Sequence, residues 1–337
     1  MTRNRRRTTT LKDVAEAAGV SSATVSSILN GSRSNTRVSP ETRERVASIA
    51  KDLGYRPNAI ARALVQRSTN IVGFYFGYGH LEPHDPFHAE VLTGLQNGCG
   101  ETQRDLIIHY SFYRRGLDEV YRELVGGKID GLIALAAPSD PLIRRLIDAR
   151  LPVVAMTDAI QGMPSVIADD AHGSRLIANH LHEKGHRAIF YRTCPGESDS
   201  AGRRYAAFEA RAEELGMKVY LATTTDWKGS LGEAELDLMR RRRELGITAA
   251  VCWGDPSANA LLSHCIKEGV SIPGELAIAG FNGIEPPVEP ARRLTTVRAS
   301  WSRVAQRAVE LLVEVIEGRA VELRTVLPTE FQPGDTT

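Results

Sequence analysis

The sequence predicts two kinds of structure in one chain: a small all-α N-terminal unit built on a helix-turn-helix, followed by an α/β domain of two lobes. Three observations predict this arrangement. Residues 11–30 carry two short helical repeats separated by a glycine. From residue 70 onward, short apolar runs alternate with helical stretches, as in parallel-sheet domains. Residues 1–67 hold thirteen Lys and Arg against five Asp and Glu, a net charge of +8, and the remainder carries −7.

Composition narrows the class of protein. The 337 residues suffice for two or three domains, and 42% hydrophobic with 25% charged residues is typical of a soluble globular protein. No run of eighteen apolar residues occurs, and the basic N-terminus leads into no apolar segment, so we expect no membrane span and no secretory signal. Four widely spaced cysteines indicate reduced thiols in a cytoplasmic protein. The separation of charge favours a nucleic-acid-binding module joined to a separate domain.

The first helix is expected over residues 11–18, and a second follows a tight turn. The apolar face of the first consists of Leu11, Val14, Ala15 and Ala18. Gly19 can end that helix in the left-handed conformation, and the Ser21 hydroxyl can cap the next one. The inner stripe of the second helix is Val25, Ile28 and Leu29. Its outer face carries only small groups, which suits a DNA major groove, although a helical hairpin in a core has the same spacing.

A third helix and a short fourth one complete the N-terminal unit. Ser39-Pro40-Glu41 predicts a helix start, and the expected buried stripe is Val46, Ile49, Ala50 and Leu53. Gly54 ends the helix, and Pro57 keeps Arg56 extended. Asn58 can cap a helix over residues 59–65. Because seven residues are too few for a stable isolated helix, we expect it to need DNA or a second copy of the chain.

Two series of strands are expected after residue 70. The first comprises residues 71–76, 106–110, 129–135 and 152–156, and the second comprises 187–191, 218–222, 248–253 and 275–280. A helix over 301–317 and a last strand over 326–331 follow. Open α/β sheets bind ligands beyond the carboxyl ends of their strands, so we expect a ligand site there.

Several N-terminal segments identify a family resemblance. They are Thr10-Leu11-Lys12-Asp13-Val14-Ala15, Ala18-Gly19-Val20-Ser21, Thr24-Val25-Ser26, Leu29-Asn30-Gly31, Val38-Ser39-Pro40-Glu41-Thr42-Arg43-Glu44-Arg45-Val46 and Gly54-Tyr55-Arg56-Pro57-Asn58. This pattern resembles the DNA-binding headpiece and hinge of the LacI/GalR family of bacterial transcription regulators. The resemblance implies a homodimer on a double-stranded DNA operator, a small-molecule effector such as a sugar or related metabolite, repression, and no cofactor.

The resemblance also implies domain boundaries. The headpiece is expected at 1–56, the hinge helix and linker at 57–68, and a two-lobed effector domain of the type I periplasmic-binding-protein fold at 69–337. Within it, the N-lobe is expected at about 69–162 and 292–319, and the C-lobe at about 163–291 and 320–337. The chain is expected to cross between lobes near residues 160–164, 290–294 and 318–322.

The predicted DNA-binding positions follow from the match to the family, apart from Arg37, which lies in a longer loop. They are Thr10, Leu11, Ser21, Ser22, Ala23, Thr24, Ser26, Ser27, Asn30, Arg37, Val38, Tyr55, Asn58, Ala61 and Leu64. Thr24, Ser26 and Asn30 match phosphate-binding positions, and Ser22, Ala23 and Ser27 match base-reading ones. Ser27 replaces the usual arginine and cannot read guanine bidentately.

Two further DNA contacts are hypotheses. The loop over 31–37 is longer than in many family members, and Arg33 and Arg37 in it are expected to contact phosphates. Leu64 matches a leucine wedged into a minor-groove step, and the alternative is that Leu64 packs within the linker.

The predicted effector positions are Phe87, Asp158, Arg204, Trp227, Asp255 and Asn282, with Phe87 and Trp227 as apolar walls of the cleft. An arginine such as Arg204 can bind sugar hydroxyls, carboxylate or phosphate. Three departures from the family bear on the ligand: Ala207 and Gly254 replace a glycine and an asparagine, and Asn282 replaces an aspartate. Asp255 and Asn282 have an alternative role as caps at strand ends.

Other classes of protein fit less well. His80, His84 and His88 are separated by prolines and lack metal-site order, so no metal is expected. No nucleophile, Walker or dinucleotide motif occurs in a fitting context, so an enzyme on this frame is not expected. A periplasmic solute-binding protein would need a signal peptide and no basic headpiece. The sequence therefore predicts a DNA-binding regulator that responds to a metabolite.

Overall fold

The computed structural model of the chain describes residues 9–30, 38–79, 81–82, 84–108, 116–194, 196–227, 229–284 and 292–337. The chain divides into two compact units. One unit is Met1–Ile71 with Gly127–Asp130, and the other is Val72–Gly126 with Gly131–Thr337. Within the described ranges, no helix has the length and apolar character needed to cross a membrane.

The N-terminal unit contains the expected helices. They are α1 (Leu11–Ala18), α2 (Ser22–Asn30), α3 (Pro40–Asp52) and α4 (Ala59–Gln66). Gly19 ends α1 with φ 65°, and the Ser21 hydroxyl accepts the Thr24 backbone N–H at 3.1 Å, as the turn between α1 and α2 predicts. Ser39 caps α3 in the same way through the Thr42 N–H at 3.3 Å.

A small apolar core joins α1, α2 and α3. Its fully or nearly fully buried members are Val14, Ala15, Ala18, Val25, Val46 and Ala50. The expected stripe of α3 is wrong at Leu53, which is 42% exposed. The reason is that Leu53 is the C-cap residue of α3 and its carbonyl accepts a hydrogen bond from the Thr9 hydroxyl, so the chain turns away before the side chain reaches the core.

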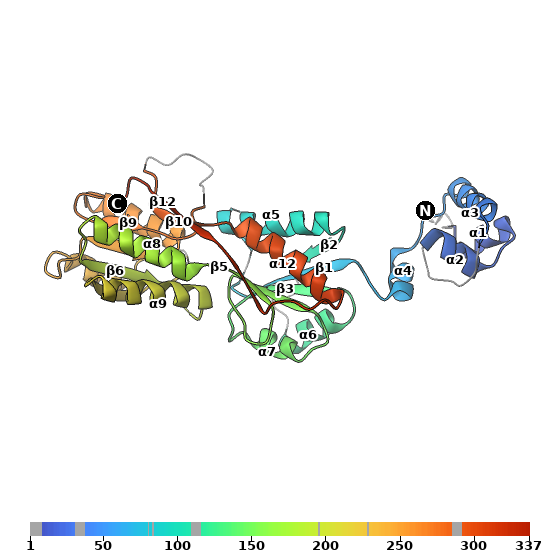
Figure 1. The fold of residues 1–337 in the computed structure, drawn as a ribbon, viewed down its shortest axis with the longest axis horizontal. Coiled ribbons are helices and arrows are strands. Elements are labelled where there is room, and N and C mark those ends of the chain that lie inside the picture. Colours follow the sequence, from blue (N-terminus) through green and yellow to red (C-terminus); the bar gives the residue numbers. More distant parts are fainter. Residues whose placement is uncertain are drawn as a thin grey trace, which may run out of the picture. The chain divides into compact units, whose positions relative to one another are not determined.

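The first lobe of the second unit is built on a parallel sheet. Within the described residues its six strands follow the order β11-β5-β4-β3-β1-β2. Their bounds are β1 (Ile71–Phe76), β2 (Asp105–Ile108), β3 (Gly131–Leu135), β4 (Val153–Met156), β5 (Ser165–Ala168) and β11 (Arg324–Leu327). Figure 1 shows α5 (Pro86–Glu101) and α12 (Trp301–Ile316) on one face, and α6 (Leu117–Val125) and α7 (Pro141–Ile147) on the other.

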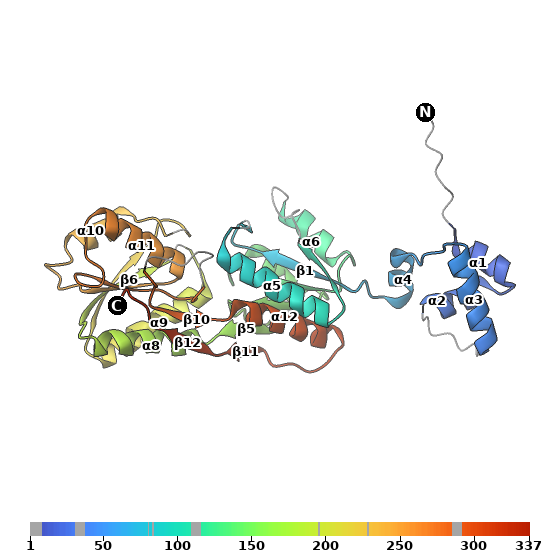
Figure 2. The same cartoon turned by 90° about the horizontal axis from the view of Figure 1, so that it is seen from above.

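The second lobe repeats this architecture. Its described strands follow the order β7-β6-β8-β9 and are all parallel. They are β6 (Ala188–Thr193), β7 (Lys218–Thr223), β8 (Ala249–Cys252) and β9 (Ala277–Ala279). In Figure 2, α8 (Asp170–Glu183) and α9 (Asp199–Glu214) cover one face, and α10 (Glu233–Arg240) and α11 (Asp255–Lys267) cover the other. The antiparallel pair β10 (Thr296–Ala299) and β12 (Thr329–Gln332) adjoins β9 through the bridge Ala279–Thr295.

The positions at which the chain crosses between lobes differ from those expected. Residues 165–168 form β5, which pairs with β4 in the first sheet, so the first crossing follows Ala168 rather than 160–164. The second crossing falls at Ser300, between β10 and α12. The expected strand 326–331 is two strands in different sheets, because Pro328 lacks the N–H needed to continue a ladder. The third crossing is therefore at residue 328, and the expected lobe boundaries at 162/163, 291/292 and 319/320 are wrong.

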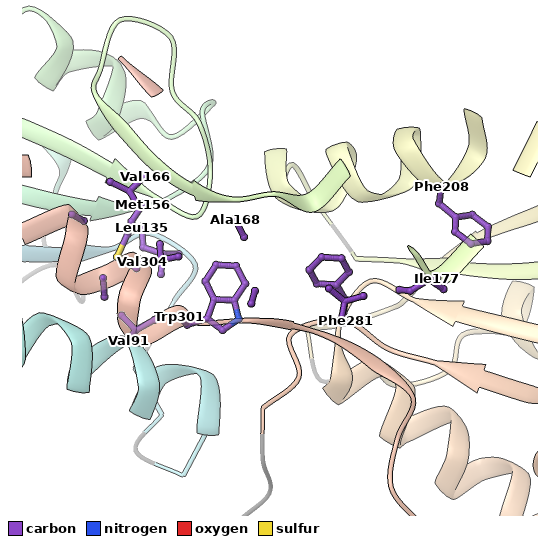
Figure 3. Packing of buried hydrophobic residues seen from close by; sticks show 14 of the residues in the cluster. Val91, Leu135, Met156, Val166, Ala168, Ile177, Phe208, Phe281, Trp301 and Val304 are labelled. Atoms are coloured by element: carbon purple, nitrogen blue, oxygen red, sulfur yellow. The ribbon is translucent and has the colours of Figure 1, made fainter. Parts of the chain in front are cut away.

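One apolar core extends through both lobes. Figure 3 shows Val91, Leu135, Met156, Val166 and Val304 around the first-lobe end of the core, and Ile177 and Phe208 in the second lobe. Trp301 and Phe281, each 1% exposed, lie where these two groups approach. Burial of these large aromatic rings stabilises the packing of the two lobes against each other.

The close packing of α5 on α12 depends on glycine, which generates a prediction. A Cβ at Gly94 would lie 2.1 Å from the Ser302 carbonyl oxygen, whereas a Cβ at Gly100 of the same helix would meet nothing within 4 Å. We expect Gly94→Ala to lower the free energy of unfolding by about 1–3 kcal/mol through overpacking. Gly100→Ala should leave it unchanged or raise it by up to about 1 kcal/mol. Urea unfolding followed by circular dichroism measures both, and equal effects would contradict the packing argument.

Candidate functional site

The outward face of α2 carries small polar side chains. Ser22 and Ala23 are exposed and Thr24 is partly exposed, whereas Val25 is fully buried in the headpiece core. The Ser21 and Thr24 hydroxyls lie 2.8 Å apart at the start of the helix. A helix held by its inner face and lined outside with short side chains can approach base edges in the major groove closely.

A pocket of about 450 Å³ lies within the N-terminal unit. Six of the sequence-predicted DNA-binding residues line it: Thr10, Leu11, Ser26, Tyr55, Asn58 and Ala61. Thr9, Arg56, Arg62 and Gln66, which were not predicted, line it as well. Hydroxyl, amide and guanidinium groups of this kind bind phosphate oxygens and set the register of a protein on a duplex.

The structure describes the other predicted DNA-binding residues only in part. Ser27 is partly exposed on α2, and Val38 is partly buried ahead of α3. Asn30 ends α2, but its side chain lies outside the described residues. Arg33 and Arg37 lie outside them as well, so the hypothesis about loop 31–37 stays a prediction.

Leu64 lies on α4 with 78% of its surface exposed, the largest value among the exposed large hydrophobic residues of the described chain. The alternative in which Leu64 packs within the linker is therefore wrong. Asn58 begins α4, since its side-chain oxygen accepts the Ala61 N–H at 3.4 Å. The helix thus presents an apolar side chain that no other described part of the chain covers.

Aromatic rings from both lobes meet in a region that we call the inter-lobe junction, defined by Tyr78, Asp158, Arg203, Arg204, Trp227, Trp253 and Asn282. The Tyr78 and Trp227 ring centroids lie 5.2 Å apart, and those of Trp227 and Trp253 lie 5.6 Å apart, both edge-to-face. Phe87 packs edge-on against Trp301 at 5.2 Å. Trp227 is 38% exposed, so part of this aromatic surface stays open to a ligand.

Asp158 connects the end of β4 with the start of α9. Its carboxylate accepts hydrogen bonds from the Tyr78 hydroxyl, from the Ser200 backbone N–H at 2.7 Å and from the Ser198 hydroxyl at 3.4 Å. Burial, together with the charge of Asp158, raises the pKa of Tyr78, so its hydroxyl remains a donor at neutral pH. Asp158 therefore fastens the first lobe to the second.

Arg204 is buried and paired. Its Nε donates to the Asp170 carboxylate at 2.7 Å, its Nη1 donates to the Trp253 carbonyl at 2.6 Å, and its guanidinium carbon lies 3.9 Å from the Phe281 ring centroid. Arg203 donates to the other oxygen of Asp170 at 2.6 Å. Since Asp170 is 1% exposed and shared by both arginines, the charge of Arg204 is balanced within the chain.

Asp255 is the first residue of α11, and both of its carboxylate oxygens are used within the chain. One accepts the Thr296 hydroxyl at 2.6 Å, and the other accepts the Ile284 N–H at 3.1 Å. Burial raises the pKa of Asp255 to about 6, against the lowering effect of these hydrogen bonds and of Arg204. These contacts favour the alternative of a capping role at the strand end.

Asn282 follows β9 in a strained conformation with φ 120°. Its side-chain oxygen is buried and has no hydrogen-bond partner among the described residues. Thr157, after β4, is also strained, with φ 68°. These two strained residues follow strands of different sheets, β4 and β9. Backbone strain of this kind clusters at binding sites, and the orphaned oxygen of Asn282 is an acceptor for a ligand donor.

Trp227 is carried by a loop that a buried arginine holds in place. Arg192 is fully buried, and its guanidinium donates to the Glu235 carboxylate at 2.6 Å, the Gly229 carbonyl at 2.8 Å and the Ser257 carbonyl at 2.5 Å. Gly229 adopts φ 79°, and a Cβ there would lie 2.5 Å from the Cα of Ser257. The loop after β7 is thus fixed against α11, which orients Trp227.

Sequence reasoning missed several residues of the inter-lobe junction. Trp253 follows β8 directly and Tyr78 lies two residues after β1, so the rule that ligand sites lie at strand carboxyl ends could have found both. Arg203 and Asp170 offered no such signal, because they lie on α9 and α8 and meet only through the folding of the second lobe. No group of three potential metal-ligating side chains occurs among the described residues, and His80 lies outside them.

The chain combines a basic helix-turn-helix unit, whose adjoining helix exposes a leucine, with a two-lobed α/β domain. Polar and aromatic residues lie between the two lobes. Together these features define a class of protein. This class is the DNA-binding transcriptional regulator with an effector-binding domain.

Comparisons with known proteins support the same class. Residues 10–58 match the model of the bacterial regulatory proteins of the lacI family, and residues 178–337 match a periplasmic binding protein-like domain. The chain is 30% identical over 318 residues to the HTH-type transcriptional regulator GalR of Escherichia coli strain K12, covering 92% of this chain and 90% of that one.

Two solved structures are also similar. The transcriptional regulator CelR in complex with cellobiose has a TM-score of 0.69 at 25% identity, covering 98% of this chain and 100% of CelR. The lac repressor dimer bound to operator and the anti-inducer ONPF has a TM-score of 0.80 at 23% identity, covering 98% and 99%, a likeness of fold. The chain belongs to the lacI family of bacterial regulatory proteins, and it is a regulator rather than an enzyme.

The raised pKa of Asp255 predicts a pH dependence of stability. A carboxyl with a folded-state pKa of about 6 binds a proton more tightly than the unfolded chain does, so its contribution to stability is lost as the pH rises from about 4 through 6. We expect the unfolding free energy of wild type, relative to Asp255→Asn, to fall by up to about 3 kcal/mol over this range. Urea unfolding of both proteins between pH 4.5 and 7.5 measures the difference, and a constant difference would contradict the assignment.

Proposed function

We propose that the protein is a repressor that binds a symmetric operator as a homodimer. A neutral sugar that binds at the inter-lobe junction changes the affinity of the repressor for this operator. The observation that carries the ligand class is the pairing of every described arginine of the junction with a carboxylate, beside an open aromatic surface. The lac repressor structure, a dimer on its operator, supports the dimer.

Charge at the junction argues against an anionic effector. Arg203 and Arg204 share Asp170, and Arg298, which adjoins Asn282, lies 2.7 Å from the Glu90 carboxylate. A phosphate or carboxylate ligand needs a cation to balance its charge, and binding here would break an existing buried or half-buried pair at considerable cost. Asp158 adds a further negative charge in contact with Tyr78.

The open polar atoms suit hydroxyl groups. Among the described residues, the Asn282 side-chain oxygen is a buried acceptor without a partner, and the Trp253 indole N–H is a buried donor without one. A hydroxyl can both donate and accept, so a polyol satisfies both. Aromatic rings such as Trp227 provide a surface for the apolar face of a sugar, and the CelR complex with cellobiose supports this ligand class.

Coupling to DNA requires the two lobes to change arrangement. A ligand that binds one arrangement more tightly shifts the population toward it. The hinge helix α4 lies between the headpiece and the effector domain in the chain, so a different arrangement alters how two hinges in a dimer present Leu64 to the minor groove. Palindromic half-sites are the corresponding property of the operator.

The exposure of Leu64 generates a prediction for operator binding. If Leu64 inserts between base pairs, Leu64→Ala loses apolar burial of about 1.5–3 kcal/mol, which is roughly a 10- to 100-fold loss of affinity. Gel shifts at several salt concentrations, on a genomic fragment that the wild type retains, measure this loss. Ile266→Ala is a matched control, because Ile266 is 61% exposed in the second lobe and should leave affinity unchanged. Equal affinity of Leu64→Ala and wild type would contradict the insertion.

The ligand class is tested by thermal shift. Neutral mono- and disaccharides, sugar acids, sugar phosphates and purines are added separately to wild type and to Trp253→Phe, which lacks the indole N–H. We expect a neutral sugar to raise the melting temperature, by an amount equal to about 2.7 kcal/mol of stabilisation at a hundredfold excess over Kd. Trp253→Phe should reduce that shift. Stabilisation by sugar phosphates or sugar acids alone would overturn the neutral-sugar assignment.

A further inference from the structure

One carboxylate holds the segment that leads out of the hinge helix. Asp130 Oδ1 accepts the Thr69 N–H at 2.6 Å and the Thr69 hydroxyl at 2.7 Å, and its Oδ2 accepts the Ser68 hydroxyl at 2.6 Å and the Asn70 N–H at 2.9 Å. The Asp130 N–H donates to the Ile71 carbonyl at 2.8 Å. We call this set of contacts the Asp130 clamp.

The clamp is charged, which makes its hydrogen bonds strong. Partial burial raises the pKa of Asp130, but the hydrogen bonds from Ser68, Thr69 and Asn70 outweigh burial and hold the pKa below its ordinary value. The side chain is therefore ionised at neutral pH. Hydrogen bonds to an ionised acceptor are about twice as strong as those between neutral groups.

The connection between the clamp and the hinge helix is very short. Helix α4 ends at Gln66, and Arg67 is the single residue between it and Ser68. One residue spans at most about 3.6 Å. Arg67, before the clamped segment, and Asn70, its last residue, adopt left-handed conformations with φ 54° and 57°. The backbone therefore turns at both ends of this segment rather than running extended.

The clamp is also joined to the effector domain through the chain. Asp130 immediately precedes β3, which pairs with β1 and β4 in the middle of the first-lobe sheet. The clamped residues 68–70 immediately precede β1. Both ends of the clamp therefore enter neighbouring central strands, which are rigid elements.

We propose that Asp130 is a positioning residue for operator binding: by fixing residues 68–70 it sets where hinge helix α4 ends and in which direction it runs, and so determines how the helix reaches DNA. This inference rests on the proposed operator function. A purely structural alternative is that Asp130 only stabilises a surface turn, in which case its loss would lower stability without a specific effect on DNA.

Asp140 provides a matched control for that alternative. Its carboxylate accepts the Leu142 N–H at 2.8 Å, the Ile143 N–H at 3.3 Å and the Tyr75 hydroxyl at 2.8 Å. It is another multiply bonded aspartate of the first lobe, and all of these contacts lie away from the hinge. Asp140→Ala should therefore cost stability without changing the direction of α4.

The experiment uses the full chain. A duplex selected from a random pool with wild type, and a random-sequence duplex, are titrated with wild type, Asp130→Ala, Ser68→Ala and Asp140→Ala, and thermal unfolding is measured in parallel. We expect Asp130→Ala to weaken binding of the selected duplex at least tenfold and Ser68→Ala about threefold. Binding of the random duplex should change by less than twofold, because headpiece contacts to phosphates remain. Asp140→Ala should lower the melting temperature and leave both affinities within twofold.

Each other outcome has a defined meaning. Affinity for the selected duplex within twofold of wild type for Asp130→Ala, or for Ser68→Ala where Asp130→Ala does not fold, overturns the inference. An equal loss of affinity in Asp140→Ala also overturns it, because stability alone would then account for the effect. A wild-type protein that selects no duplex overturns the proposed operator function, and the inference with it.

Discussion

The two lobes depend on one buried carboxylate at the place where the chain first crosses between them. Asp170 is the first residue of α8 and accepts hydrogen bonds from both Arg203 and Arg204. Through these arginines it is linked to the Thr157 carbonyl after β4 and to the Trp253 carbonyl after β8. A buried charge that loses its partner costs several kcal/mol, so each member of this set holds the others in position. These contacts hold the crossing segment together with the carboxyl ends of β4 in one sheet and β8 in the other.

This arrangement separates the groups that hold the junction together from the groups that can receive a ligand. The arginines are occupied by Asp170, and Asp255 is occupied by Thr296 and a backbone N–H. Among the described residues, the neutral groups left open at the junction are the Asn282 oxygen, the Trp253 indole N–H and the exposed part of Trp227. We expect the proposed ligand site to discriminate by shape and by hydrogen-bond pattern rather than by net charge. The strained backbone of Asn282 is consistent with such preorganisation, since tertiary contacts impose a conformation that local preference disfavours.

The DNA-binding unit follows a different principle, in which charge and exposure matter more than burial. The +8 charge of residues 1–67 attracts the phosphate backbone, and the small side chains of α2 allow close approach to the groove. Leu64 is exposed on a helix of eight residues that has little stability of its own. Such a helix is sensitive to how its ends are held. The Asp130 clamp, one residue beyond that helix, holds one of those ends.

The headpiece helices, the α/β class and the positions of most strands along the chain could be predicted from the sequence, because caps, glycines and apolar periodicity act over a few neighbouring residues. Ser21 and Gly19 specify their turn without help from distant parts of the chain. Only the tertiary structure decided that β5 returns to the first sheet, that Pro328 divides the last strand between lobes, and that Arg204 is paired with Asp170. The contacts of Arg204 with Asp170, of Asp255 with Thr296 and of Asp130 with Ser68 join residues 34 to 62 positions apart. Burial and hydrogen-bond partners of that kind arise only when the whole domain closes around them, and no local pattern encodes them.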